Sequence, residues 1–396
     1  MYSTEIKGVV APGFEPVRSE LQRNFDRRDE IGAACTAYHR GHKVVDLWGG
    51  FRDRERQLPW ERDTLVLMFS ATKGVSAMTV ALARARGLLD YEAPVAEYWP
   101  EFAQYGKHDV TVRQLLSHQA GVPTVDVHLD AELLDDPDRL ADVLARQRPL
   151  WKPGSRHGYH AITLGLYERE LIRRVDPRAR TLGAFFQEEI ARPLGLEFYI
   201  GTPPSVPAQR IAVHQTMAQV RSATPAQLTV LREALRRGSF VQEVLWNPRL
   251  ERPEAIGQPP YRRVEIPAAN GIGQVRSVAK LYGSFACGAA ELSLDTATFA
   301  ALAAAPVAPD GGAEDAVLGI PTSYSLGFWK PSPSLRFGSG GAAFGAPGSG
   351  GCFGYADPVA EVGFAYAPNR LGVLIWDDPR EKLLREALYA CLPSGV

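Results

Sequence analysis

Strand-like patterns occur near both ends of this 396-residue chain, whereas its middle carries helical patterns. The N-terminal side has apolar or alternating runs at 31–38 and 43–48, which indicate a hairpin. The C-terminal side has glycine-rich apolar runs at 324–329, 351–356 and 362–367, which indicate further strands. Strands so far apart in the sequence share one core only if both ends of the chain build the same sheet. We therefore predict an α/β (α+β) fold in which one antiparallel sheet is covered by helices.

A change of pattern along the chain divides it into two predicted regions. Residues 1–95 and 265–396 carry the strand patterns and are predicted to form a sheet domain, and residues 96–264 an inserted, mostly helical lobe. Helical spacing of apolar residues occurs at 14–29, 70–86, 131–148, 161–174, 182–191, 226–237 and 379–391. The segment 305–315 is rich in proline, glycine and acidic residues and is predicted to be a surface loop.

The balance of charges excludes some classes of partner. Lysine and arginine total 44 against 45 acidic residues, so the net charge is −1 and no basic field attracts nucleic acid or an anionic membrane. No stretch approaches the roughly 20 uninterrupted apolar residues of a membrane span. The first residues lack the basic start and apolar segment of a secretion signal, and the four cysteines show no CxxC spacing. We expect a cytoplasmic protein with reduced thiols and no metal site.

The segment that bears most on function is Ser70-Ala71-Thr72-Lys73. An apolar run, 65–69, leads to a serine at the start of an amphipathic helix, and Lys73 follows one turn later on the same face. A serine hydroxyl becomes a useful nucleophile when a base takes its proton, and an amine can do so if burial lowers its pKa. Taken alone, the pattern also fits a serine that caps a helix, followed by an exposed lysine.

Two further segments supply groups that acyl transfer needs. Tyr159 follows a Trp-Lys-Pro-Gly turn that begins at Trp151, and it stands just before a predicted helix. The glycine-rich segment 345–351 leads into a strand, and such backbone can bring its N–H groups close to a substrate. A serine–lysine pair needs a second proton handler and N–H donors of this kind to cleave an acyl bond. Without that context, Tyr159 also fits a buried core tyrosine.

Together these blocks resemble the serine β-lactamase and penicillin-binding-protein superfamily, and most closely its esterase branch, the family VIII carboxylesterases. Ser70-Ala-Thr-Lys73 matches the S-x-x-K block, and Tyr159-His-Ala161 stands where that family has Tyr-x-Asn. Residues 115–123, LLSHQAGVP, resemble the family segment LLSHTSGLP, and Ala346-Pro-Gly-Ser349 stands at the third block. The resemblance extends over nearly the whole chain and implies a β-lactamase-like fold.

Two positions depart from the family pattern. Ala161 replaces the asparagine of the second block, and Ala346 replaces the cation of the third. In β-lactamases and peptidases those residues hold the amide and the carboxylate of the substrate, and an alanine side chain can do neither. Neutral esters do not require the cation. The resemblance therefore implies a hydrolase of carboxylic esters with short acyl chains.

The resemblance also implies a role for each block. Ser70 is expected to be the nucleophile, Lys73 its neutral base, and Tyr159 the group that relays the proton to the leaving alkoxide. The backbone N–H groups of Ser70 and Ser349 are expected to form the oxyanion hole. Substrate contacts are expected from Trp151, His160, Phe344, Ala346, Gly348 and Gly350. Water then hydrolyses the acyl-enzyme, so the partner is a small-molecule ester and no cofactor is needed.

Three other functions fit the same residues. A β-lactamase or D,D-peptidase uses the same groups, and an acyltransferase passes the acyl group to an alcohol or amine instead of water. A binding protein on this fold makes no covalent use of Ser70. An α/β-hydrolase triad is disfavoured, because the chain has no Gly-x-Ser-x-Gly elbow.

Overall fold

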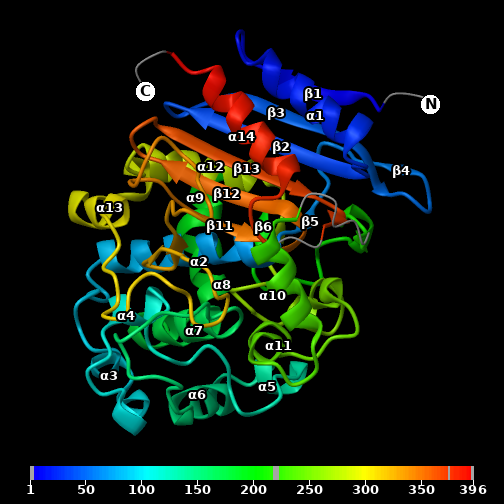
Figure 1. Cartoon of the computed structure of the whole chain (residues 1–396). Helices are drawn as coiled ribbons and strands as arrows, with labels where there is room; N and C mark the ends of the chain where they lie inside the picture. Colours follow the sequence, from blue (N-terminus) through cyan, green and yellow to red (C-terminus); the bar gives the residue numbers. More distant parts are fainter. Residues whose placement is uncertain (1–3, 217–222, 373–374, 394–396) are drawn as a thin grey trace.

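The computed structural model describes residues 4–216, 223–372 and 375–393, and it centres on a nine-stranded antiparallel sheet (Figure 1). The strand order is β1-β3-β2-β13-β12-β11-β10-β9, with β4 beside β3. These strands are β1 Ile6–Val10, β2 Gly32–His39, β3 His42–Asp53, β4 Leu58–Pro59, β9 Tyr324–Ser325, β10 Phe328–Trp329, β11 Phe344–Gly348, β12 Cys352–Asp357 and β13 Val362–Pro368.

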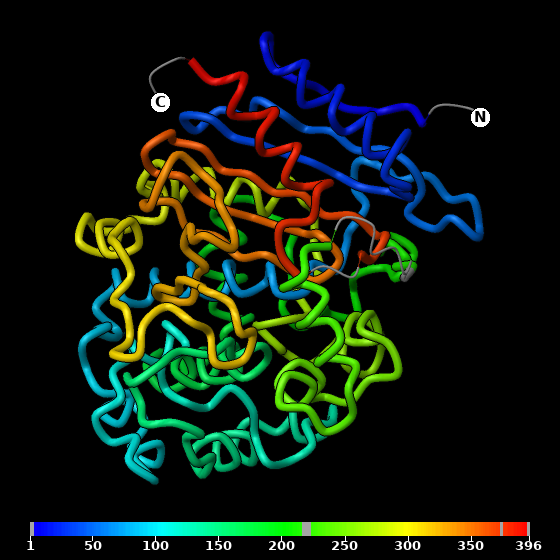
Figure 2. The backbone as a smooth tube through the Cα atoms, viewed as in Figure 1, coloured from blue at the N-terminus to red at the C-terminus, as the bar shows by residue number. Residues whose placement is uncertain are grey.

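Both ends of the chain build this sheet, as the strand patterns predicted. β2 pairs with β3 on one side and with β13 on the other, so Ala37 lies between Val45 and Phe364. For this reason the blue and orange strands run side by side in Figure 2. The antiparallel sheet and its covering helices confirm the predicted fold class.

Helices cover both faces of the sheet. α1, Glu15–Arg27, and α14, Pro379–Ala390, lie against each other on one face (Figure 1). α12, Val275–Ala286, packs on the other face against β2, β12 and β13. α1 and α14 stand where the helical spacing at 14–29 and 379–391 predicted them.

Helix α2, Thr72–Ala85, is buried along nearly its whole length, on the side of the sheet away from α1 and α14. An apolar helix of this kind must be enclosed by other elements. Here α7, Thr163–Val175, α8, Leu182–Phe186, and β11 pack around it. In the described ranges, no helix is both long and apolar enough to cross a bilayer.

Most of the other helices lie in the middle of the chain. The remaining helices are α3 Val95–Tyr98, α4 Val112–Leu116, α5 Ala131–Asp135, α6 Pro137–Arg146, α9 Arg192–Leu194, α10 Pro225–Leu235, α11 Phe240–Leu245 and α13 Thr296–Ala303. Two small sheets join distant segments: β5 Val66–Leu67 with β8 Ile272–Gly273 and β6 Phe198–Tyr199, and β7 Gln215–Thr216 with β14 Arg370–Leu371.

Two predicted elements need correction. The run 324–329 is not one strand but the hairpin of β9 and β10, because Leu326 and Gly327 have positive φ angles of 51° and 89° and turn the chain back. The helical pattern 131–148 is interrupted at Pro137, which cannot continue α5 and instead begins α6.

The segment predicted as a surface loop, 305–315, ends inside the protein. Asp315 is only 1% exposed, although proline, glycine and acidic residues dominate the segment before it. The composition of the segment therefore predicts the exposure of its start but not the burial of its end, where hydrogen bonds hold the carboxylate of Asp315 in the interior.

A buried arginine ties α14 to the sheet. Arg380 is 2% exposed and forms ion pairs with Glu30, at 3.1 Å, and with Asp378, at 2.9 Å. It also donates to the carbonyl oxygens of Gly350, at 2.6 Å, and Arg370, at 3.1 Å. The removal of the guanidinium group from such a cluster deprives the buried carboxyl groups of this ion-pair partner.

We predict that Arg380→Met lowers the free energy of unfolding by about 3–5 kcal/mol, because the buried carboxyl groups of Glu30 and Asp378 lose this ion-pair partner. Urea denaturation measures this loss. The control is Arg146→Met, since the Arg146–Asp142 pair at 2.8 Å has side chains that are 67% and 55% exposed. Its loss should stay below about 1 kcal/mol, and equal losses in the two variants would contradict the expectation.

Candidate active site

Ser70 stands at the point where a buried segment reaches a cavity. The chain runs from β5 into a 3₁₀ turn, Phe69–Ala71, and then directly into α2. Phe69 and Ala71 are buried, whereas Ser70 is half-buried. Phe69 has a φ of 43°, a sparsely populated conformation for a bulky residue, and such strained turns are common at functional sites.

Lys73 lies one helical turn further on and is held among dipoles. It is 1% exposed, and its Nζ is 3.2 Å from Oγ of Ser70. Nζ donates to the carbonyl oxygens of Ala161, at 2.5 Å, and Ala268, at 2.9 Å. A neutral amine has two N–H bonds and one lone pair, so two carbonyl acceptors leave the lone pair for the hydroxyl of Ser70.

The surroundings of Lys73 favour its neutral form. Burial lowers the pKa of Lys73 to about 7, although the carboxyl group of Glu168 opposes the shift. Glu168 is fully buried on α7 and accepts a hydrogen bond of 2.6 Å from Ser76, one turn beyond Lys73 on α2. Burial raises the pKa of Glu168 to about 8. The raised pKa favours the protonated form of Glu168, which weakens its attraction for a charged Lys73.

Tyr159 completes a group of three around the serine hydroxyl. Its side chain is 1% exposed, and its ring centroid lies 4.9 Å from Nζ of Lys73. Burial raises the pKa of Tyr159 well above its usual range, although the nearby side chain of Ser70 opposes this shift. The phenol is therefore protonated at neutral pH and can give a proton to a nearby oxygen.

Aromatic rings fix the plane of the Tyr159 ring. Tyr324 stacks on it with 6.2 Å between centroids and 18° between planes. Trp329 meets it edge-on at 5.7 Å, and His118 lies 5.4 Å away. These contacts leave the phenol little freedom to swing away from Ser70.

The backbone of β11 approaches the start of α2 very closely. A Cβ atom on Gly348 would lie 2.7 Å from the carbonyl oxygen of Met68 and 2.9 Å from the nitrogen of Ala71, so only glycine fits there. Ser349 follows at once in a short 3₁₀ turn, and both Ser349 and Ser70 line the same cavity. Two separate segments of backbone thus border the same cavity beside the Ser70 hydroxyl.

The cavity beside Ser70 is apolar. It has a volume of about 450 Å³ and is walled mainly by α10, α11 and the segments around them. Gln227 is a polar member of the lining, and its side chain donates to the carbonyl oxygen of Trp376 at 2.7 Å. Within the described ranges, no lining residue carries a charge. The cavity therefore suits a neutral, apolar group better than an ion.

The predicted substrate-contact residues lie in different places. Gly350 lines the cavity. Phe344 is fully buried against Phe328, with ring centroids 4.8 Å apart, and Ala346 is 1% exposed within β11. The described lining of the cavity includes neither of these two side chains, and it does not include Gly348.

His160 and Trp151 lie behind the reacting groups. His160 is fully buried, it accepts from the N–H of Val122, and its Nδ1 is 2.6 Å from the carbonyl oxygen of Gly158. Burial lowers the pKa of His160 to about 4, so it is neutral. Trp151 packs edge-on against His160 at 6.2 Å, and neither residue is among the described residues that line the cavity. Both lie where they support the loop that carries Tyr159.

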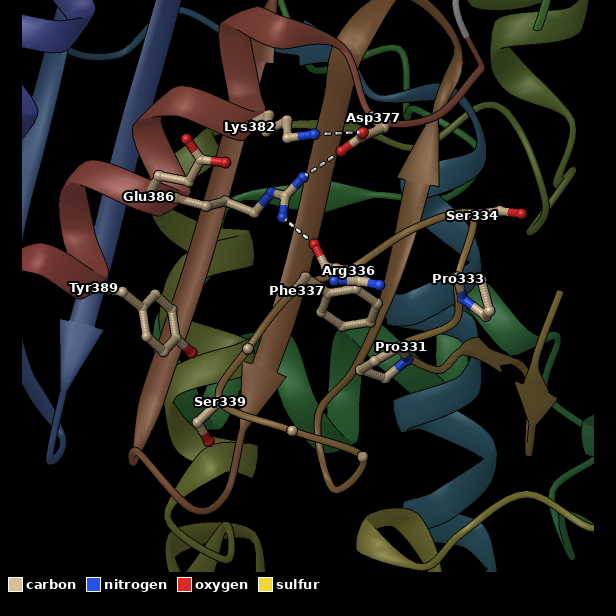
Figure 3. Close-up of a pocket in the computed structure, with 14 residues that line it drawn as sticks. Pro331, Pro333, Ser334, Arg336, Phe337, Ser339, Asp377, Lys382, Glu386 and Tyr389 are labelled. Atoms are coloured by element: carbon tan, nitrogen blue, oxygen red, sulfur yellow. Dashed lines mark hydrogen bonds and ion pairs between the residues drawn. The ribbon is translucent and has the colours of Figure 1, made fainter. Parts of the chain in front are cut away.

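A second cavity, of about 870 Å³, lies between α14 and the loop 331–341 (Figure 3). Its charged groups are largely paired with one another: Asp377 binds Lys382 and Arg385, each at 2.9 Å. Ser70, Lys73 and Tyr159 are not among the described residues that line it. Of the two cavities, the first is therefore the one that Ser70 borders.

Sequence reasoning missed three polar groups of the site. These are the carbonyl oxygen of Ala268 and the carboxyl groups of Glu168 and Asp315. A usable signal existed for Glu168, because it stands four residues after Leu164 and three before Leu171, on the apolar face of its helix. No comparable pattern marks Ala268 or Asp315.

Comparison with known proteins extends over almost the whole chain. The sequence profile described as Beta-lactamase matches residues 21–386. Esterase/beta-lactamase LipL from Mycobacterium tuberculosis is 34% identical over 380 residues, which cover 92% of this chain and 83% of that protein.

Solved structures agree with this similarity. A crystal structure of a family VIII carboxylesterase superposes with a TM-score of 0.85 at 37% identity, covering 98% of this chain and 100% of the other. A penicillin-binding protein homologue from Caulobacter crescentus superposes with a TM-score of 0.82 at 36% identity, with the same shares covered. The similarity therefore includes the helical middle of the chain as well as the sheet.

We predict that the amine of Lys73 titrates near pH 7 in the folded protein, because burial disfavours its charged form. NMR of protein labelled at the lysine Cε carbons measures the midpoint, and the signal that disappears in Lys73→Met identifies the residue. Lys330, buried among carbonyl oxygens with a pKa lowered to about 8, provides an internal comparison. A midpoint near the ~10.4 of free lysine would contradict the assignment.

Proposed function

This chain belongs to the beta-lactamase family, and we propose that within it the protein is a carboxylic ester hydrolase that works through an acyl-enzyme on Ser70. One observation carries the proposal: a half-buried serine hydroxyl lies 3.2 Å from a buried amine whose N–H bonds are used by two carbonyl oxygens. The esterase names of its relatives support the same reaction class.

The acylation step follows from these contacts. Oγ of Ser70 attacks the ester carbonyl carbon while its proton passes to Nζ of Lys73. Tyr159 gives its phenol proton to the leaving alkoxide, and Lys73 returns the proton to the phenolate. The Oγ–carbon bond forms, the carbon–alkoxide bond breaks, and both Lys73 and Tyr159 end in their starting states. A water molecule then hydrolyses the acyl-enzyme by the reverse sequence of proton transfers.

The proposed oxyanion hole consists of the backbone N–H groups of Ser70 and Ser349. The close approach of Gly348 to the start of α2 supports this pair, because it brings the two segments to one wall of the cavity. Each such donor is worth on the order of 100-fold or more in rate.

The proposed substrates are neutral esters with short acyl chains. Alanine at positions 161 and 346 provides no group for a substrate amide or carboxylate, and the described cavity lining is uncharged. The cavity volume of about 450 Å³ limits the size of the apolar group that can be enclosed.

Hydrolysis of β-lactams is a second candidate activity, supported by the double name of the Mycobacterium tuberculosis relative. A cephalosporin carries a carboxylate, however, and the cavity offers it no cation among the described lining residues. Turnover of nitrocefin far above that of p-nitrophenyl butyrate would favour this activity over ester hydrolysis.

We predict that kcat/KM for p-nitrophenyl butyrate rises with pH through an apparent pKa near 7, because only the neutral amine of Lys73 can accept the serine proton. Below this pH the ammonium form predominates and the rate falls. Lys73→Ala should lose about 1000-fold or more in rate. A flat profile between about pH 6 and 9 would contradict the role of Lys73.

A fluorophosphonate probe should label the protein at Ser70, and Ser70→Ala should abolish both labelling and ester turnover. Intact-protein mass spectrometry measures the added mass, and peptide mapping gives its position. An unlabelled wild-type protein would favour a binding role, and undiminished activity of Ser70→Ala would exclude the mechanism.

Filling the cavity should shorten the preferred acyl chain. Ala234, 6% exposed on α10, lines the cavity, so Ala234→Phe should reduce kcat/KM for octanoate esters about tenfold more than for acetate esters. Leu228→Phe on the same helix is the control, since Leu228 is 42% exposed. A panel of p-nitrophenyl esters measures the effect, and equal losses for all chain lengths would contradict the assignment of this wall.

A further inference from the structure

We propose that Asp315 is a positioning residue for Tyr159, holding both the backbone of that tyrosine and the ring stacked on it. The inference rests on the proposed function, in which Tyr159 relays the proton. Asp315 does not reach the cavity beside Ser70, so it acts through the tyrosine and not on the substrate.

Five donors converge on the buried carboxylate of Asp315. They are the backbone N–H groups of Tyr159, Val317 and Leu318, at 3.2, 2.8 and 2.8 Å, and the hydroxyl groups of Thr322 and Tyr324, at 3.3 and 2.6 Å. No lysine or arginine of the described ranges is hydrogen-bonded to it, and His157 is connected only through Thr322, at 3.1 Å. Hydrogen bonds rather than a cation hold this carboxylate inside.

The two contacts on the tyrosine side define where the phenol lies. The bond from the N–H of Tyr159 fixes the backbone from which its side chain projects. The bond from Tyr324 fixes a ring that stacks on Tyr159 with 6.2 Å between centroids and 18° between planes. Position along the backbone and tilt of the ring are thus set by one carboxylate. A displacement of about 1 Å in a catalytic group can cost 100-fold in rate.

The charge of Asp315 supports the same role. Burial is the main reason that the pKa of Tyr159 is raised, and the negative charge of Asp315 acts in the same direction. The phenol therefore keeps its proton until an alkoxide is formed beside it. A neutral side chain at position 315 would raise the pKa of Tyr159 less, and it would accept the hydrogen bonds from Tyr159 and Tyr324 more weakly.

A second carboxylate provides a matched control. Asp357 is fully buried and also accepts bonds from three backbone N–H groups, those of Ser339, Val359 and Ala360, and from two hydroxyl groups, those of Ser339 and Tyr389, at 3.0 and 2.6 Å. It lies at the end of β12, and its described partners include none of the reacting groups. Asp357→Asn thus reproduces the loss of a buried charge without touching Tyr159.

The test is a double-mutant cycle on the full-length protein with p-nitrophenyl butyrate. Asp315→Asn and Asp357→Asn are each made in the wild type and in Tyr159→Phe, and urea denaturation verifies that every variant is folded. In the wild-type background, we expect Asp315→Asn to lower kcat about 10- to 100-fold and to change KM less than about threefold. In the Tyr159→Phe background, the same substitution should lower kcat by less than about threefold. Asp357→Asn should leave kcat within about twofold in both backgrounds.

Three outcomes overturn the proposal. Equal loss from Asp315→Asn in both backgrounds, or equal loss from Asp357→Asn, would show a general effect on stability. If Tyr159→Phe itself keeps the wild-type rate, the proposed function of Tyr159 fails as well, which separates the two failures.

Should Asp315→Asn not fold, Tyr324→Phe keeps the stacked ring but removes one bond to the carboxylate. Its kcat should then fall by about threefold or more, again only when Tyr159 is present.

Discussion

The burial of one amine without a counter-ion is the constraint around which this molecule is arranged. Lys73 lies on a helix enclosed on all sides, and its hydrogen-bond partners are two carbonyl oxygens and a hydroxyl group. The carbonyl groups come from residues 88 and 195 positions away in the sequence. The segments that carry Ala161 and Ala268 must therefore both be packed against α2 before the hydrogen bonds of the amine are satisfied. A buried amine left without acceptors would be strongly destabilising, so the site and the fold depend on each other.

The other groups near Ser70 follow the same electrostatic rule. The pKa of Lys73 lies near 7, the raised pKa of Glu168 favours its protonated form, and Tyr159 keeps its proton. The cavity beside them is uncharged among its described residues. Fixed dipoles in a dry environment act most strongly on a charge that appears only during the reaction. A site with so few resting charges is suited to the oxyanion of ester cleavage.

How much of this could be predicted depends on the range of the interactions. Local patterns were sufficient for α1, for β2, β3, β12 and β13, and for the placement of Ser70 and Lys73 on one turn, because each depends on neighbours in the sequence. The β9–β10 hairpin was missed because Leu326 adopts a positive φ that its residue type does not signal.

The missed parts of the site are those set by contacts between distant segments. The sequence around Asp315 is typical of a surface loop. Only the fold brings the N–H of Tyr159, 156 positions earlier, to its carboxylate. The carbonyl oxygen of Ala268 carries no signal in its residue type at all. Of the three missed groups, only Glu168 could have been identified from periodicity, because it is a charged residue on the apolar face of its helix.

The uncharged cavity also has a consequence for what happens after the chemistry. Hydrolysis of an ester converts a neutral molecule into an acid, which ionises as soon as it meets neutral water. An apolar wall with no cation among its described residues offers that anion no compensation for leaving solvent. The apolar wall that accepts the neutral ester therefore binds the anionic acid poorly. Ready release of the product then follows from the absence of charge, and accumulated acid competes poorly with fresh ester.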